Sequence, residues 1–179
     1  MMRHELGKWN LDELVKNPTR TVFDKKLAKI ESTAKRFEKI KKSLNPKISS
    51  GKFLKLLHDV EYISEKSSVI GGYASLRYSE NTQSDEATSL LTRITKFGSD
   101  IENRLLFFDL WWKKQVDEKN ARRLIKSAGQ FSEYLRFKRL LAKYSLSEPE
   151  ERIINTLDVT GISALVKLYD KITNAYVYV

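Results

Sequence analysis

Apolar side chains recur every three or four residues along most of this sequence, which is the spacing of amphipathic α-helices. Three long stripes run through residues 23–44, 53–74 and 87–112. Each stripe would place its apolar residues on one helix face that must be buried against a neighbour. We therefore predict three long antiparallel helices. The stripes comprise Phe23, Leu27, Ile30, Ala34, Phe37, Ile40 and Leu44; Phe53, Leu56, Val60, Ile63, Ser67, Ile70 and Ala74; and Ala87, Leu91, Ile94, Gly98, Ile101, Leu105, Phe108 and Trp112.

Capping residues and prolines set the predicted ends of the first two long helices. Thr21 with Asp24 resembles a capping pair at the start of the first helix. Pro46 ends that helix, because proline lacks an N–H donor and restricts the residue before it. Ser49 or Ser50 then starts the second helix as its N-cap.

The third long helix is predicted to start after Ser84, an N-cap serine that precedes two acidic residues in the first turn. Beyond it, the chain turns and a shorter basic pair of helices is expected at about 120–127 and 130–144. These shorter helices would form a smaller lobe beside the long ones.

The C-terminal part carries its own start and stop signals. Ser147 with Glu150 forms a capping box for a short helix to about Asn155, and Gly161 separates it from a last helix. The final residues, 175–179, alternate aromatic and β-branched side chains, which is typical of a strand. The predicted fold is all-α, with three long antiparallel helices, a smaller helical lobe and a short C-terminal strand.

Composition narrows the classes of protein. The chain has 179 residues, of which 41% are hydrophobic, enough for one ordinary domain or two small lobes. Cysteine is absent, which excludes disulfides and thiolate chemistry and makes the cytoplasm the expected location. Residues 1–9 lack the apolar stretch of a secretory signal, and no apolar run approaches the roughly 20 residues that span a bilayer. We expect no membrane partner.

The net charge of +10 raises an alternative, a basic module that binds nucleic acid or an acidic protein. Residues 20–47 hold ten Lys or Arg against three acids. However, Phe23 and Phe37 lie on the apolar stripe, where they would pack in the core and not stack on bases. We therefore favour a solvated basic face over nucleic-acid binding. The basic positions that would test this alternative are Lys35, Arg36, Lys39 and Lys42.

No catalytic or metal-ligating set is recognisable. A catalytic zinc site needs three protein ligands, whereas the nitrogen donors here are His4 and His58 alone. His4 and Glu5 begin like a zincin motif, but Lys8 stands where the second histidine would be. His58 is near Asp59 on a predicted helix, and an exposed position is the favoured interpretation. We predict no catalytic residue and no bound cofactor.

The segment 104–112 is apolar on nearly every side of its helix. It would form either the centre of a multi-helix core or a face for a partner around Trp111.

Four segments together resemble the N-terminal portion of oligoendopeptidase F-type peptidases, relatives of thimet oligopeptidase. They are Trp9–Leu14; Phe53–Tyr78, ending in Gly-Gly-Tyr-Ala-Ser-Leu-Arg-Tyr; Asn103–Trp112; and Leu146–Asp170. The resemblance implies a cytosolic zinc metallopeptidase that cuts short peptides in an enclosed helical channel. The family's HExxH helix and zinc lie in a downstream catalytic domain, and no position here matches that motif.

The resemblance also implies an architecture. Residues 1–145 would be the N-terminal helical-bundle domain, and 146–179 the start of the following region. The helices would form one wall of the substrate channel, with the catalytic domain of the same peptidase as partner. A homodimer through exposed apolar surface is also predicted.

Tyr73, Arg77 and Tyr78 are candidates for a channel-facing cluster, since an arginine flanked by tyrosines could bind a peptide carboxylate. The competing interpretation, which we favour, is that the tyrosines pack and Arg77 forms a salt bridge.

Overall fold

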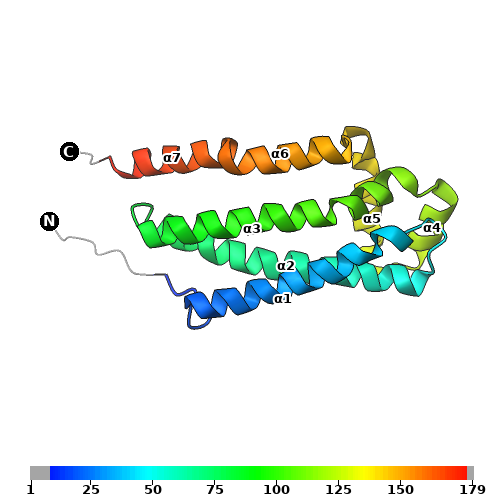
Figure 1. Ribbon diagram of the computed structural model, residues 1–179, viewed down its shortest axis with the longest axis horizontal. Coiled ribbons are helices and arrows are strands. Elements are labelled where there is room, and N and C mark those ends of the chain that lie inside the picture. Colours follow the sequence, from blue (N-terminus) through cyan, green and yellow to red (C-terminus); the bar gives the residue numbers. More distant parts are fainter. Residues whose placement is uncertain (1–8, 177–179) are drawn as a thin grey trace.

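The computed structural model describes residues 9–176, and all of its regular structure is helical. Three long helices come first, two short ones follow, and two more return along the bundle (Figure 1). The helices are α1 (Arg20–Glu38), α2 (Ser50–Glu80), α3 (Asp85–Leu110), α4 (Glu118–Lys126), α5 (Ser132–Leu140), α6 (Glu148–Thr160) and α7 (Ile162–Asn174). The all-α prediction is confirmed.

Most of the predicted helix starts are confirmed by side-chain caps. The hydroxyl of Ser49 accepts a hydrogen bond from Lys52 N at the start of α2, and that of Ser84 accepts one from Ala87 N at the start of α3. The prediction for α1 was wrong by two residues, because Thr19 is the N-cap. Its end was also misplaced, since α1 stops at Glu38 and tightens into a 3₁₀ helix, Lys39–Ser43, before Pro46.

The predicted stripes face inward and fill two adjoining clusters between α1, α2 and α3. One cluster is mainly aliphatic and contains Phe23, Leu27, Ile30, Ile63, Ile70, Tyr73, Ile94 and Ile101. The other is aromatic and closes the end of the bundle near α4 and α5, where it contains Phe37, Phe53, Phe107, Phe108, Trp111, Trp112, Leu124 and Leu135. Trp111 is buried at 3% exposure, so the surface predicted around it is core and not a partner contact.

A π-helical turn, Trp111–Gln115, continues α3 and directs the chain into the small lobe. Its closing hydrogen bond runs from Val116 N to Trp111 O at 3.2 Å. The indole Nε1 of Trp112 donates to Leu135 O at 3.0 Å, and Arg139 donates to the carbonyl oxygens of Trp112 and Val116 at 3.1 and 2.9 Å. These bonds fasten α5 to the end of α3.

The last two helices run back beside α3 (Figure 1). The Ser147–Glu150 capping box is confirmed, but α6 extends to Thr160 and not only to about Asn155. Gly161 joins α6 to α7 as predicted. A Cβ at this position would lie 2.8 Å from Leu157 O, a closer approach than a side chain tolerates.

The predicted C-terminal strand is wrong within the described residues. The backbone N–H of Ala175 bonds to Ile172 O and Thr173 O, which closes the last turn of α7, and Tyr176 N bonds to Thr173 O. These amides are used within the helix end and are not available for a sheet. The other strand residues, 177–179, lie outside the described residues.

Replacing Trp112 by Phe should lower the free energy of unfolding by about 2 kcal/mol, because Leu135 O loses its buried donor and a gap opens in the aromatic cluster. The same change at Trp9, which is 50% exposed, is the matched control and should have little effect. Urea unfolding of both variants measures the difference. Equal stability of the two variants would contradict the role of Trp112 in fastening α5 to the end of α3.

Candidate functional site

The side chains of Tyr73, Arg77 and Tyr78, the cluster predicted near the end of α2, do not point into one common cavity. Tyr73 is buried and packs its ring against Phe23 with centroids 5.5 Å apart, and burial raises its pKa. Tyr78 is buried and donates its hydroxyl to Lys167 O of α7 at 3.0 Å. Arg77 is exposed and forms a salt bridge with Glu80. The geometry matches the packing interpretation, while a role in a channel stays a prediction.

No metal centre can be built from the described residues. Within 9–176, no group of three or more His, Asp or Glu side chains lies close enough together to hold an ion. His58 is exposed, and its Nδ1 lies 3.1 Å from Glu61 Oε2 on the same helix. The described residues therefore offer no ligand set for the zinc that the resemblance implies. His4 lies outside the described residues.

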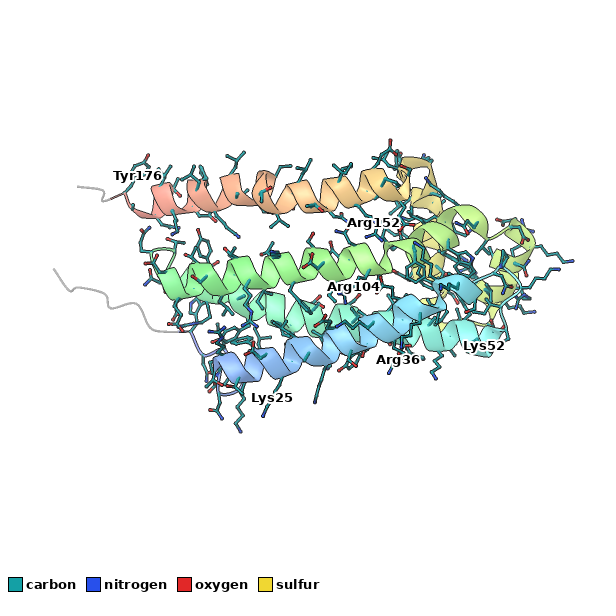
Figure 2. The ribbon with its side chains drawn as sticks, in the orientation of Figure 1. Lys25, Arg36, Lys52, Arg104, Arg152 and Tyr176 are labelled. Carbon is teal, nitrogen blue, oxygen red and sulfur yellow. The ribbon has the colours of Figure 1, made fainter. Side chains whose placement is uncertain are left out.

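The basic face of α1 lies on the opposite side of the bundle from α6 and α7, as Lys25 and Arg36 show in Figure 2. Part of its charge is used within the chain. Lys35 pairs with Glu31, and Arg36 pairs with Asp59, both at 2.9 Å. Binding of nucleic acid or an acidic protein to this face stays a prediction.

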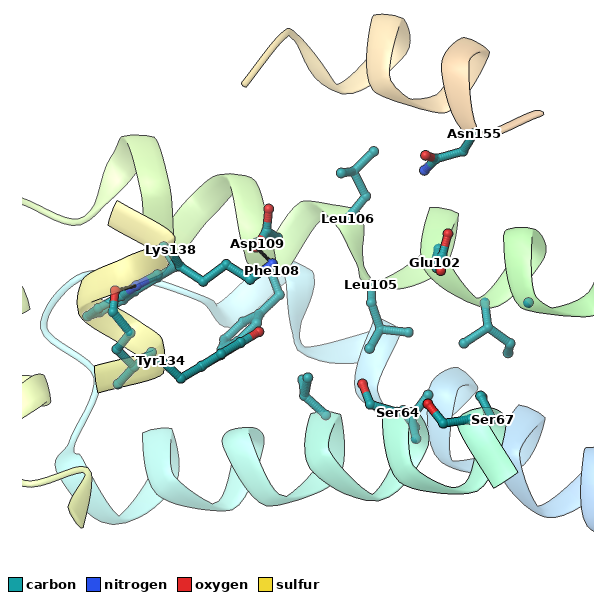
Figure 3. Close-up of a pocket in the computed structure, with 17 residues that line it drawn as sticks. Ser64, Ser67, Glu102, Leu105, Leu106, Phe108, Asp109, Tyr134, Lys138 and Asn155 are labelled. Carbon is teal, nitrogen blue, oxygen red and sulfur yellow. Dashed lines mark hydrogen bonds and ion pairs between the residues drawn. The ribbon is translucent and has the colours of Figure 1, made fainter. Parts of the chain in front are cut away.

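A groove lies between α2, α3, α5 and α6, and we call it the α3 groove (Figure 3). Its volume is about 390 Å³, within the usual range of small-molecule sites. Ser67 and Gly98 are small residues on facing helices that leave room for it. The wall formed by α6 is polar at Asn155. The backbone oxygen of Asn155 accepts a hydrogen bond from the Ser99 hydroxyl at 2.9 Å, and its side-chain Nδ2 donates one to Asn103 Oδ1 at 3.0 Å.

Two acidic residues line this groove, Glu102 and Asp109, and Glu102 is the one without a cationic partner in the described part of the chain. Partial burial there, and next the charge of Asp158 on α6, raise the pKa of the Glu102 carboxyl. In the described part of the chain, neither a salt bridge nor a hydrogen bond to a cation neutralises this carboxylate. Because the outer side of Glu102 is still exposed, water screens part of the effect. The sequence analysis missed Glu102, since one acid on a helix carries no signal of burial.

The side chains of α7 are arranged in the reverse of an ordinary surface helix. Its half-buried residues are all polar: Ser163, Lys167, Asp170, Lys171 and Thr173. Its apolar residues are exposed, from 47% at Ile172 to 70% at Ile162. Together with the exposed apolar residues of α6, they form what we call the α6–α7 apolar face: Ile153, Ile154, Leu157, Ile162, Leu165, Val166, Leu168, Tyr169 and Ile172.

Polar contacts hold α7 beside the bundle. In the described part of the chain, two hydrogen bonds join α7 to the long-helix bundle. The Tyr78 hydroxyl donates to Lys167 O at 3.0 Å, and Gln83 Nε2 donates to Lys171 O at 3.2 Å. No residue of α6 or α7 is fully buried. The sequence showed the apolar stripe of this segment but not the direction in which it faces.

Comparison with known families agrees with the resemblance. The family model described as Oligopeptidase F, for the N-terminal domain of M3 peptidases, matches residues 114–177. Residues 114–177 are therefore similar to the N-terminal domain of oligoendopeptidase F-type peptidases, which supports the resemblance. The match covers α4 to α7 and both sides of the boundary predicted after residue 145, which stays a prediction. No curated protein and no solved structure matches the chain.

None of the helices in residues 9–176 combines the length and the apolar character that a membrane crossing requires.

Replacing Glu102 by Gln should raise the melting temperature at pH 7 to 8. The folded-state pKa of Glu102 is raised, so the folded chain binds this proton more tightly than the unfolded chain, and the charged form costs stability. That cost fades as the pH falls below the ordinary value of 4.5, where both states are protonated. Thermal unfolding from pH 3.5 to 8 measures the difference. Asp100→Asn, an exposed acid on the same helix, is the control, and equal pH profiles for the two variants would contradict the burial of Glu102.

Proposed function

We propose that this chain is the non-catalytic N-terminal domain of an oligoendopeptidase F-type zinc metalloendopeptidase, where it forms one wall of the channel that admits short peptides. Its α6–α7 apolar face would pack against the catalytic part of the same peptidase. The zinc and its ligands would come from that catalytic part. The cytoplasmic location inferred from the cysteine-free composition belongs to the same proposal.

The observation that carries this proposal is the outward direction of the apolar side chains of α7. Full burial of one Leu or Ile side chain is favourable by about 1.5 to 3 kcal/mol. Leu165 and Ile162, at 67% and 70% exposure, forgo most of that gain in this chain. An accumulation of exposed apolar side chains of this kind is typical of a binding site. Because the face lies within the segment that matches the family, a surface of the same peptidase is the partner that we propose.

The polar side of the two helices supports the same arrangement. Lys41 binds Glu148 at 2.9 Å at the start of α6, and this pair is the first reason that the pKa of Glu148 is lowered. Lys114 Nζ donates to the carbonyl oxygens of Ser145 and Leu146, both at 2.7 Å. These bonds fix where α6 begins. The apolar side is thereby directed away from the bundle before any partner is bound.

Substituting Ile162 and Leu165 together by Ser should weaken binding to the catalytic part of an oligoendopeptidase F-type peptidase by about 100-fold or more, because two anchoring side chains are lost. Isothermal titration calorimetry with that catalytic part, produced without its own N-terminal domain, measures the change. Leu140→Ser on α5 is the matched control, because Leu140 is as exposed as Ile162. Circular dichroism should show that all three chains remain helical.

Two results would contradict the proposal. One is an equal loss of affinity for the catalytic part in the double variant and in the Leu140→Ser control. The other is peptide hydrolysis by this chain alone that persists after contaminating enzymes have been excluded, because the domain is proposed to be non-catalytic.

A further inference from the structure

The α3 groove has charges of opposite sign at its two ends. Glu102 lies at one end, near Asp158 of α6, and carries the negative charge. Lys138 of α5 lies at the other end, where its Nζ is 2.9 Å from Asp109 Oδ1 (Figure 3). Lys113 Nζ lies 2.5 Å from the other oxygen of Asp109. Two lysines share one carboxylate, so this end keeps one positive charge.

Lys138 stays protonated and retains hydrogen-bonding capacity. Burial alone would lower the pKa of Lys138, but the hydrogen bond and the charge of Asp109 outweigh it, and the pKa is raised. The ring of Tyr134 lies 5.6 Å from Lys138 Nζ and adds a favourable cation–π contact. An ammonium has three N–H donors, and the side chains of Asp109 and Tyr134 accept two of them, which leaves one. A carboxylate that enters the groove can therefore accept a charge-assisted hydrogen bond from Lys138.

The space between the two ends is mainly apolar. It is lined by Val60, Ile63, Ile101, Leu105, Trp112 and Leu135. Ser64, Ser67 and Ser68 add hydroxyl groups to the lining, and the buried Oγ of Ser67 has no hydrogen-bond partner among the described residues. Such an orphan hydroxyl is unusual in a folded protein and suits a ligand that brings a donor or acceptor.

The distance between the ends sets the length of a fitting molecule. Glu102 and Asp109 are seven positions apart on α3, so they share one face about 10 Å from each other along the axis. An extended peptide spans about 3.3 to 3.6 Å per residue, and three residues therefore span about the same distance.

We propose that the α3 groove is a binding site for a short zwitterionic molecule with an apolar body, whose ammonium binds Glu102 and whose carboxylate binds Lys138. An apolar tripeptide with free termini has this charge pattern and length. All the groups that recognise it belong to this chain. The site is thus independent of what covers the α6–α7 apolar face. A negative result for the groove would therefore leave the proposed function standing, and a negative result for the proposed function would leave the groove standing.

Trileucine with free termini tests the site, because Trp112 lines the groove and its fluorescence reports occupancy. The intact chain should show a saturable change in tryptophan emission. Acetylating the peptide amine, or amidating its carboxylate, should each weaken binding by about tenfold or more, because each removes one charge-assisted contact. Isothermal titration calorimetry of the same three peptides provides a second readout that does not depend on tryptophan.

Variants assign each end of the peptide to its residue. In Glu102→Gln, free and acetylated trileucine should bind equally, whereas amidation should still weaken binding. In Lys138→Met, free and amidated trileucine should bind equally, and acetylation should still matter. Asp100→Asn, an exposed acid on the same helix, should behave like the unaltered chain.

Three results would overturn the site. The first is the absence of any saturable signal with trileucine in either readout. The second is equal affinity of the unaltered chain for the free and the blocked peptides. The third is an equal effect of Glu102→Gln and Asp100→Asn on binding. Circular dichroism of each variant should match that of the unaltered chain, so that a loss of binding reports the lost charge.

Discussion

The structure depends on one constraint: the apolar side chains of α7 are not buried by any part of residues 9–176. The core between α1, α2 and α3 is already filled by their own stripes, with Ile30, Phe37 and Ile63 at 2% exposure or less. The side of α7 that faces this bundle is polar. Burial of apolar surface is the main favourable term in folding, and the apolar side of α7 gains little of it within residues 9–176, which is the basis of the proposed partner surface.

The path of the chain explains how this orientation arises. The π turn at Trp111–Gln115, fastened by Trp112 and Arg139, ends α3 and places α4 and α5 across one end of the bundle. From there α6 returns along α3, where asparagine and serine side chains hold it by hydrogen bonds. Because these contacts are polar and the facing residues are small, a groove remains between the helices. The attachment of α5 to the end of α3 through Trp112 and Arg139 therefore positions both the exposed face and the groove.

The sequence predicts much of the fold because helix stripes and caps are local signals. Ser49, Ser84 and the Ser147–Glu150 box are identifiable from neighbouring residues alone, and the three long stripes became the core. The features that the sequence predicted wrongly or did not predict, the C-terminal strand and the groove, depend on more than local signals. The alternation at 175–179 resembled a strand, yet Ala175 completes a helix end, because its N–H bonds to the carbonyl oxygens of Ile172 and Thr173. The groove was not predictable, because Glu102 and Lys138 come to line one space only when α5 folds against α3.

The orientation of α7 can be measured directly, because the chain contains no cysteine and a single introduced thiol is therefore a unique probe. The rate of thiol labelling is compared for Leu165→Cys, Ser163→Cys and Ile101→Cys, with and without the catalytic part of an oligoendopeptidase F-type peptidase. We expect fast labelling at 165, slower labelling at 163, very slow labelling at 101, and protection of 165 alone when the catalytic part is added. Slow labelling at 165 in the isolated chain, with fast labelling at 163, would show that α7 packs its apolar side inward and would contradict the account.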